Sequence, residues 1–557
     1  MKNLRLHSTN ADQLDYRRDG RYTEPYVGFI KAENEDEDNQ TFYNKKTPNR
    51  ITIYLKEGTT LTILKGRNYS DLSQRKGEEV VLTERVNVLD LDTDYPYGFN
   101  TKEGKDNTSN IEYIDLYEYT DKTIPSKLFS ECTSIESVVI PYGITAVNWN
   151  QFEKCTSLVD VVIPESVTSI GGGSFSECTS LKNLIMPDTV TEINSYTFLK
   201  STALKRVKLS SKITETPLYM LANCSSLEHV VLPSSLTKIG GHTFTNCSKL
   251  KELDIPEGVT TMGQYVCADD KELERVKLPS TLREIGNSAF NACHKLKDIE
   301  LPPSLTKIGV ACFNQCRKIQ STVIPSGVTE LPAYVYQDCE SLSSVTFHDN
   351  ITKIGAHAFH FCFPLNNIHI PRNLTEMGEA AFYQCNSLTS VDIPNGVTKI
   401  EKETFYNCTA LTSITLPSNV TKIGERALFN CKALKELTLP QGFTILEPYV
   451  ISNCHSLTTL TIPEGVTTAK YRALDSCVGL NTVTFPSTME RFEGYVMDGC
   501  VKLTTFIINA VEPPTFGDGV FRNCAALTEI KVPRRSVQKY KDANGWRNYA
   551  SKIVAID

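Results

Sequence analysis

The sequence predicts a β-rich solenoid of about 18 stacked rungs, where a rung is one 23-residue repeat with a short strand and turns. A cysteine recurs every 23 residues from Cys132 to Cys500, and only Ser201 and Asp270 interrupt the series. The same apolar pattern fills each interval, and a proline stands at a fixed place in most of them. Such a period is typical of solenoids, because each unit buries its apolar face only against its neighbours.

One rung reads C-x-x-L-x-x-V-x-I-P-x-x-V-T-x-I-x-x-x-x-F-x-x. Val391 and Ile393 alternate with polar residues and predict a short, half-buried strand. Pro394 ends this strand, because proline has no N–H to donate to a ladder. Ile400 and Phe405 supply further inward apolar anchors on the return path. Stacking the rungs in register joins these residues into one continuous core.

The periodic cysteines predict a buried ladder of free thiols. Rungs about 4.8 Å apart would bring successive cysteines within bridging range, but stacked side chains point the same way rather than toward each other. Cysteine also behaves as a small buried hydrophobe. Zinc binding is not favoured, because the series contains no CxxC pair. Cys267 and Cys312 fall outside the series and are expected to fill the core.

Residues 1–110 lack both the cysteines and the period, and predict a small β-rich N-terminal domain that docks or anchors the solenoid. Residues 51–55 and 61–64 indicate one hairpin, while residues 80–82 and 86–89 indicate another strand pair.

The solenoid is expected to span residues 111–533, with Ile114 as a strand position of a degenerate first rung. Residues 534–557 are expected to cap its last rung, since an open end exposes core and strand edge. Within this cap, residues 536–549 predict an amphipathic helix and residues 553–556 a final strand. The inward residues of the helix are expected to be Val537, Tyr540 and Trp546.

The recurrence of Leu, Pro, Val-Thr, Ile, Phe and Cys at fixed offsets resembles the BspA-type leucine-rich repeat. The resemblance covers residues from about 110 to 557. This family is common in surface proteins of gut and oral bacteria and of some protozoa. The resemblance implies a β-rich leucine-rich-repeat solenoid used for adhesion or ligand capture, without naming a ligand.

Composition narrows the class of protein. The formal net charge of −7 argues against a nucleic-acid partner. The sequence contains no run of about 18 apolar residues, so membrane insertion is not predicted. The first residues lack the apolar stretch of a signal peptide. Two carriers fit these features: a bacterial cell-surface adhesin whose signal is missing from this chain, or a bacteriophage virion fibre or decoration protein. Residues 26–44 resemble the starts of virion proteins from phages of gut bacteria, and residues 1–110 would then dock to the particle.

The sequence does not predict an enzyme, a cofactor site or a metal site. It contains no HExxH, Walker A or GxSxG motif. Four histidines, His348, His357, His360 and His369, fall on two neighbouring rungs. Metal binding would require convergent ligands, and a partly exposed polar patch is the favoured interpretation.

The outward strand positions, five and seven residues after each cysteine slot, are the candidate binding residues. Val139, Val162 and Ile185 form a stacked apolar strip that indicates docking. Tyr334 and Tyr336 are candidates for a different reason, because they lie near the histidines in the most aromatic part of the solenoid. The outward positions continue with His369 and with a threonine array at Thr415, Thr438, Thr459, Thr461, Thr482 and Thr484. Threonine arrays can match repetitive glycans, although threonine is also simply a good exposed strand residue.

Charge alternates at the same positions in the middle of the solenoid. The pairs are Arg206/Lys208, Glu252/Asp254, Arg275/Lys277 and Asp298/Glu300, of which the last three lie on adjacent rungs and predict cross-strand ion pairs. We therefore expect a non-enzymatic extended scaffold that binds a protein or glycan on a cell or mucosal surface. The sequence leaves two other classes open. One is a purely structural spacer, and the other is an enzyme within residues 1–110, which is not favoured because His7 is the single histidine there and no acid–base pair is recognisable.

Overall fold

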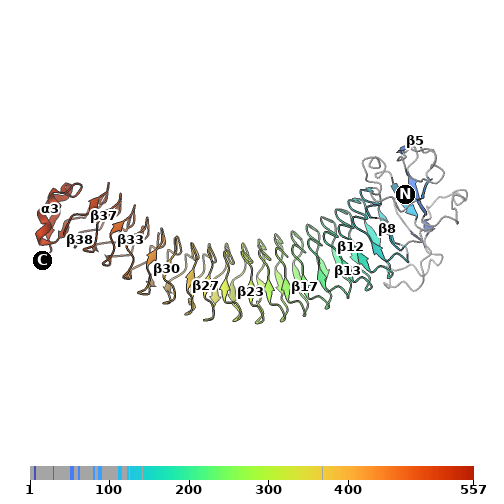
Figure 1. Ribbon diagram of the computed structural model, residues 1–557, viewed down its shortest axis with the longest axis horizontal. Coiled ribbons are helices and arrows are strands. Elements are labelled where there is room, and N and C mark those ends of the chain that lie inside the picture. The colour runs from blue at the N-terminus through green and yellow to red at the C-terminus, as the bar shows by residue number, and fades with distance from the viewer. Residues whose placement is uncertain are drawn as a thin grey trace. The chain divides into compact units, whose positions relative to one another are not determined.

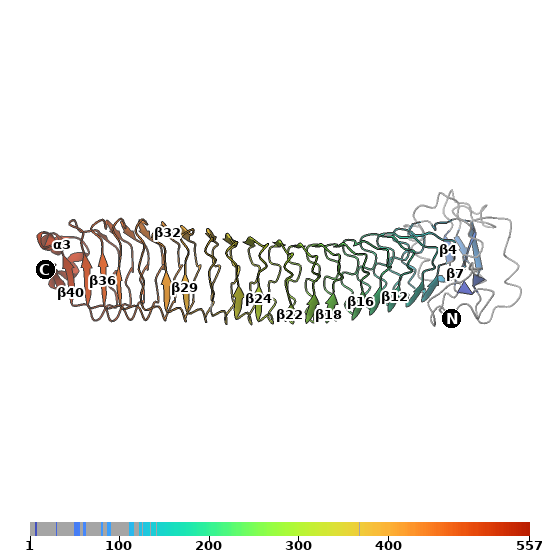
Figure 2. The same ribbon diagram turned by 90° about the horizontal axis from the view of Figure 1, so that it is seen from below.

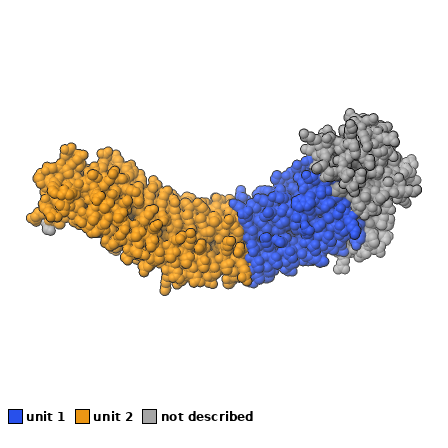
Figure 3. Space-filling model, in the orientation of Figure 1, with its two compact units in different colours: residues 1–281 blue, residues 282–557 orange. Residues whose placement is uncertain are grey.

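The computed structural model describes residues 122–124, 126–133, 135–140, 142–366 and 368–556, together with seven short strands before them (Figure 1). The chain forms two compact units, residues 1–281 and residues 282–557 (Figure 3). It is a parallel β-solenoid of about 18 turns of about 23 residues, which confirms the predicted fold class.

Most rungs contribute a longer strand, usually of three or four residues, and a second strand of two residues on the return path. The sequence pattern foresaw only the first. In the first unit, the longer strands are β8 (Ser137–Val139), β10 (Asp160–Val162), β12 (Asn183–Ile185), β14 (Arg206–Lys208), β16 (His229–Val231), β18 (Glu252–Asp254) and β20 (Arg275–Lys277). The shorter strands are β9 (Ala146–Val147), β11 (Ser169–Ile170), β13 (Glu192–Ile193), β15 (Glu215–Thr216), β17 (Lys238–Ile239) and β19 (Thr261–Met262).

The second unit repeats this arrangement. Its longer strands are β22 (Asp298–Ile299), β24 (Ser321–Val323), β26 (Ser344–Thr346), β29 (Ser390–Asp392), β31 (Ser413–Thr415), β34 (Thr459–Thr461), β36 (Thr482–Phe485), β38 (Thr505–Ile508) and β40 (Glu529–Val532). Its shorter strands are β21 (Glu284–Ile285), β23 (Lys307–Ile308), β25 (Glu330–Leu331), β27 (Lys353–Ile354), β28 (Glu376–Met377), β30 (Lys399–Ile400), β32 (Lys422–Ile423), β33 (Ile445–Leu446), β35 (Thr468–Ala469), β37 (Arg491–Phe492) and β39 (Thr515–Phe516). Strand β22 has only two residues, and the rungs that begin at Cys362 and Cys431 lack a longer strand among the described residues.

Within the solenoid the strands pair in parallel, with each residue opposite the residue 23 positions later, except that the offset is 24 where β37 pairs with β39 and β38 with β40. Val207 of β14 lies opposite Val230 of β16, for example, and Val391 of β29 lies opposite Ile414 of β31. Figure 2 shows the longer strands side by side along one face, as at β16 and β18. This register stacks identical slots, so the alternating inward residues of every rung meet in the core.

The phenylalanine slot builds a stacked aromatic column inside the solenoid. Phe129, Phe152, Phe175 and Phe198 follow one another with ring centroids 5.5–5.7 Å apart. All four side chains are buried. The column accounts for a phenylalanine at a fixed offset in the repeat, because a smaller residue would leave a void between rings.

The cysteine ladder is reduced and buried, as the sequence predicted, because all 18 cysteines are free and buried. Their thiols are also hydrogen-bonded: Cys155 Sγ donates to the carbonyl oxygen of Phe129 at 3.1 Å. The same bond recurs at other rungs, and Ser201 reproduces it with its hydroxyl, 2.8 Å from the carbonyl of Phe175. Cys267 and Cys312, outside the ladder, are fully buried core residues, also as predicted.

Two residues in each typical rung adopt a left-handed backbone conformation, four positions apart. Glu403 and Asn407 do so at φ of 57° and 62°. The second position directly precedes the cysteine and is often asparagine, which tolerates this region better than most residues. Asparagines at this position also form ladders, since Asn246 Nδ2 donates to Asn223 Oδ1 at 2.9 Å.

The strands before residue 122 pair differently from the sequence prediction. They are β1 (Leu6–His7), β2 (Phe29–Ile30), β3 (Arg50–Leu55), β4 (Thr60–Thr62), β5 (Glu79–Val81), β6 (Val86–Asp90) and β7 (Ile111–Asp115). Strand β3 pairs with β6 and β4 pairs with β5, both antiparallel, so the two predicted hairpins are wrong and are replaced by nested pairs. Ile114 lies opposite Ile53 in an antiparallel pair and does not begin the parallel ladder. Alternation identifies a strand, but it does not select the partner strand.

The C-terminal residues fold back over the last rung. The predicted single helix is instead η4 (Arg534–Ser536), α3 (Val537–Asp542) and η5 (Trp546–Lys552). The helix is interrupted by Gly545 at φ 80°, and Trp546 then enters the core. Trp546 Nε1 donates to the carbonyl of Pro514 at 2.9 Å, and Tyr540 Oη donates to that of Ala510 at 2.8 Å. The predicted last strand is confirmed as β41 (Ile553–Ala555), parallel to β40.

Candidate functional site

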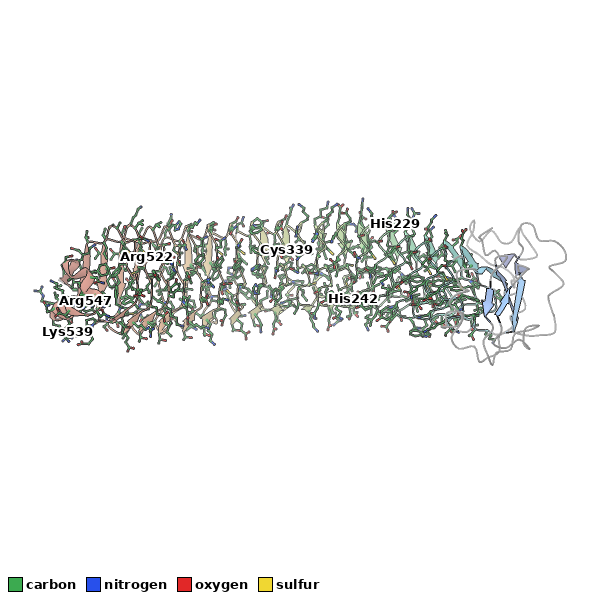
Figure 4. The ribbon with its side chains drawn as sticks, turned by 90° about the horizontal axis from the view of Figure 1, so that it is seen from above. His229, His242, Cys339, Arg522, Lys539 and Arg547 are labelled. Carbon is green, nitrogen blue, oxygen red and sulfur yellow. The ribbon has the colours of Figure 1, made fainter. Side chains whose placement is uncertain are left out.

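A hollow of about 960 Å³ lies on the outward face of the longer strands in the first unit. Strands β10, β12, β14 and β16 form it. Its lining residues are Asp160, Asn183, Leu184, Ile185, Arg206, Val207, Lys208, His229 and Val231. Figure 4 labels one of them, His229, on β16.

Two columns of exposed side chains run across the hollow, one rung after another. The polar column contains Asn183, Arg206 and His229, which lie opposite one another in register. The mixed column contains Ile185, Lys208 and Val231. Ile185 is 55% exposed and Val231 is 58% exposed, so two aliphatic side chains face solvent on either side of a lysine. The core does not require either of them, because the strand residues between the two columns face it instead. Leu184 and Val207 are buried and Val230 is half-buried.

The two cations of the hollow form no ion pair with a described residue, although Lys208 contributes to lowering the pKa of Asp188 on the preceding rung. Neither Arg206 nor Lys208 makes a side-chain hydrogen bond or ion pair with any residue that the structure describes. Arg275 stands in the same column as Arg206, yet its guanidinium bonds to Glu252 and Asp254, both at 2.8 Å. The predicted cross-strand ion pairs are therefore confirmed at Arg275. The same slot leaves Arg206 available to a ligand.

The predicted apolar strip is only partly described. Val139 lies opposite Val162 in the parallel pair β8–β10, but its side chain lies outside the described part of the chain. Val162 is half-buried and Ile185 is exposed. The sequence analysis missed Val231, because Lys208 interrupts the apolar run. Comparing residues 46 positions apart, such as Ile185 and Val231, would have identified it.

The aromatic candidates divide between surface and core. Tyr334 is 40% exposed and stacks on His357, with centroids 5.0 Å apart. Tyr336 is fully buried between Phe313 and Phe359, so its assignment as a binding residue is wrong. It occupies the phenylalanine slot, three residues before Cys339, and its hydroxyl pairs with Thr322 Oγ1 at 3.0 Å.

The four histidines do not converge. His348 Nε2 lies 2.8 Å from the carbonyl of Pro325, while His369 is exposed between buried isoleucines. His357 meets His360 edge-on, with centroids 5.1 Å apart. Burial, with a smaller effect of His357, lowers the pKa of His360 to about 4. Across the described residues, no group of three His, Cys, Asp or Glu side chains is arranged to hold a metal ion.

The threonine array lies on the outward face at its predicted positions. Thr459 lies opposite Thr482, and Thr461 lies opposite Thr484. Thr438 is exposed without belonging to a strand, and Thr415 donates its hydroxyl to Asp392 Oδ1 at 2.7 Å. The array thus presents hydroxyl groups in register, and its role in binding stays a prediction.

The sequence analysis missed a second stacked column, on the turns of the first unit. Tyr196, Tyr219, His242 and Tyr265 stack with centroids 4.2–5.2 Å apart, and Figure 4 labels His242. All four residues have positive φ. The spacing of 23 residues could have revealed the column, since each member stands in the first left-handed slot of its rung.

A third cluster joins cations and aromatic rings near the end of the second unit. Arg472 lies over Tyr495 at 5.1 Å, and Arg522, labelled in Figure 4, lies over the same ring at 4.6 Å. Both arginines also pair with the buried carboxylate of Asp498. Burial by itself would raise the pKa of this carboxyl. The bonds from Arg522 and Asn523 outweigh that effect, so the pKa lies below its ordinary value. These groups satisfy one another and therefore support structure rather than binding.

The fold and its exposed face define a leucine-rich-repeat solenoid, the class of protein in which a fixed core carries a variable outer surface. The chain belongs to the BspA type leucine-rich repeat family, whose model matches it in overlapping stretches from residue 106 to residue 544. Proteins of this class are typically binding scaffolds rather than catalysts. No helix in the described part of the chain has the length and apolar content needed to cross a membrane.

Solved structures that are similar to this chain include three bacterial leucine-rich-repeat proteins. A leucine-rich repeat protein from Bacteroides ovatus is 22% identical, with 85% of this chain and 95% of that chain covered and a TM-score of 0.38. A leucine rich cell surface protein from Faecalibacterium prausnitzii is 24% identical, with 70% and 87% covered and a TM-score of 0.31. A leucine-rich repeat protein from Eubacterium ventriosum is 21% identical, with 60% and 86% covered and a TM-score of 0.35. No curated protein sequence matches the chain.

Proposed function

We propose that this protein is a non-enzymatic binding scaffold that attaches to a protein or glycan on a cell or mucosal surface. The observation that carries the proposal is the outward strand face of β12, β14 and β16. There, exposed aliphatic side chains and unpaired cations stand together in a hollow that the core does not require. Exposed apolar groups beside uncompensated charge are typical of binding surfaces.

Attachment would use contacts spread over several rungs. The hollow spans four strands in one unit, and the threonines of β34 and β36 offer a second regular surface in the other. Each contact is weak by itself, and contacts that form together add their free energies.

The test is binding of the fluorescently labelled full-length protein to washed bacterial envelopes and to mucosal epithelial cells. Parallel samples are treated with protease or with periodate, which destroy surface proteins and glycans respectively. We expect saturable binding that one of the two treatments abolishes. A protein that binds no sample saturably would be a structural spacer, and the proposal would be wrong.

We place the protein on a bacterial surface, in line with the family to which it belongs. Mass spectrometry of washed cell envelopes and of purified phage particles from the source tests this location. Enrichment in envelopes supports the bacterial adhesin. Enrichment in particles would overturn it in favour of a virion fibre or decoration protein that mediates host or mucosal attachment.

A further inference from the structure

We propose that the hollow on β12, β14 and β16 docks an amphipathic, acidic helix of a partner protein. This inference rests on the proposed function, that the outward strand face is a binding surface, and it adds the kind of partner and its sequence pattern. The residues that would make the contact are Ile185, Arg206, Lys208 and Val231.

Charge selects an acidic partner. The hollow contains the cations Arg206 and Lys208 on adjacent outward positions of one strand, against one carboxylate, Asp160. Further along the solenoid the equivalent arginine is neutralised within the chain, because Glu252 and Asp254 of β18 form ion pairs with Arg275 of β20. Asp188 interacts with Lys208 only at longer range, and no described carboxylate forms an ion pair with Arg206 or Lys208, so two carboxylates from a partner would complete the pattern.

Spacing selects a helix over an extended segment. Ile185 and Val231 lie two rungs apart in one column, or about 9.6 Å at the usual strand separation. Helical residues i and i+7 are about 10.5 Å apart along the axis and lie on one face. In an extended segment, residues i and i+2 share a face and are about 6.7 Å apart, and residues i and i+4 are about 13 Å apart. Neither spacing matches the separation of Ile185 and Val231.

The two cations lie in the rung between the aliphatic residues, Arg206 in one column and Lys208 in the other. On the helix, residues i+3 and i+4 lie midway between i and i+7, on either side of the apolar stripe. The partner pattern is therefore apolar at i and i+7, with Asp or Glu at i+3 and i+4. The lining also disfavours a glycan as occupant, because it contains no Trp, Tyr or Phe ring on which a sugar could stack.

Fluorescence anisotropy with a designed peptide tests the proposal. The probe is a helix-stabilised peptide with Leu at i and i+7 and Glu at i+3 and i+4, and the control peptide has Gln at both acidic positions. We expect the full-length protein to bind the Glu peptide at least about tenfold more tightly than the Gln peptide, with weakening at high salt. Equal affinity for the two peptides, or no binding of the Glu peptide at about 1 mM, would overturn the proposal.

Variants locate the contact. Lys208→Glu and Ile185→Ser change exposed side chains and should each weaken binding about tenfold while circular dichroism stays unchanged. Arg275→Gln is the matched control, because Arg275 stands in the same column as Arg206 but is already paired. The double variant Arg206→Glu with Lys208→Glu should bind a peptide with Lys at i+3 and i+4. Loss of binding in Arg275→Gln equal to that in Lys208→Glu would contradict the assigned site.

The surface-binding assay separates this inference from the proposed function. The double variant is compared there with the wild type. Wild-type protein that binds the surface but not the peptide, with the double variant unimpaired, would refute the helix site and leave the scaffold function standing. Wild-type protein that binds neither surface nor peptide would refute both.

Discussion

The cysteine slot combines two demands that few side chains meet together. The side chain is fully buried, and it must donate a hydrogen bond to a carbonyl oxygen of the preceding rung, as Cys155 does to Phe129. Burial raises the pKa of the Cys155 thiol to about 12, so the donor keeps its proton at neutral pH. Serine meets the same demands at position 201, which shows that hydrogen bonding as well as packing defines the slot.

Replacing Cys155 should separate the two demands. Cys155→Ala removes the thiol donor from the carbonyl of Phe129, which keeps only the longer bond from the N–H of Cys132 at 3.4 Å, and opens a small cavity. We therefore expect a loss of about 1–3 kcal/mol in unfolding free energy. Cys155→Ser keeps a donor and should lose clearly less. Urea unfolding of the two variants measures the difference. Equal losses would show that the hydrogen bond contributes nothing measurable.

The carboxyl of Asp270 departs from the ladder. It is fully buried, and its Oδ1 accepts the backbone N–H of Cys247 at 2.6 Å. Its Oδ2 is buried without a hydrogen bond to a described residue. Burial raises the pKa of this carboxyl well above its ordinary value, although the bond from Cys247 opposes the shift. The folded protein therefore favours the protonated acid.

This raised pKa predicts a pH-dependent stability. The stability associated with Asp270 is fully present below pH of about 4, the ordinary pKa of an aspartic acid, and is lost as the pH rises toward the folded pKa. Asp270→Asn keeps an acceptor oxygen but does not ionise. In urea unfolding at pH 4 and pH 7, the variant should gain stability relative to the wild type, by about 1.4 kcal/mol for each pH unit of this interval that lies below the folded pKa. A difference that does not change with pH would mean that Asp270 is ionised in the folded state.

A rung gains its stability from its neighbours. Leu411 is fully buried, and the strand that follows it, β31, pairs with β29 through Val391 and Ile414. A rung by itself has no second layer against which to bury these residues. Changes in one core slot should therefore affect adjacent rungs and not the rung alone.

Leu411→Asp tests this coupling. Burying a carboxylate there should cost at least about 3 kcal/mol, because no partner compensates the charge. Hydrogen exchange should show lost amide protection in the rungs on both sides. Ser413→Asp, an exposed change on the same rung, should leave protection intact. A variant that melts as cooperatively as the wild type, with protection lost at no neighbouring rung, would contradict the stacking of rungs as the source of stability.

In the whole molecule, the thiols form a reduced series despite their number. The chain has 18 cysteines, and all of them are buried and free. Parallel stacking in register keeps neighbouring thiols pointing in one direction, toward carbonyls of the preceding rung. A disulfide between rungs would have to break this geometry and the hydrogen bonds with it.

Thiol titration checks the series. In denaturant without reductant, a thiol reagent should detect all 18 cysteines, and in native buffer it should detect almost none. The native protein resists because the thiols are buried and inaccessible to the reagent. A tryptic peptide that links Cys408 to Cys431 by a disulfide would contradict the free-thiol ladder.

The sequence by itself determined the solenoid, because a strict 23-residue period leaves only stacking in register as a way to bury Leu, Ile, Phe and Cys at fixed offsets. It also identified the outward positions, including Ile185, since strand alternation divides inward from outward residues. Tertiary structure decided what depends on partners distant in sequence. It decided which strand β3 pairs with, where Gly545 interrupts the last helix, and that Tyr336 belongs to the core. It also left Arg206 unpaired while Arg275 is neutralised, because pairing depends on which charges the adjacent rungs present and a single repeat does not contain them.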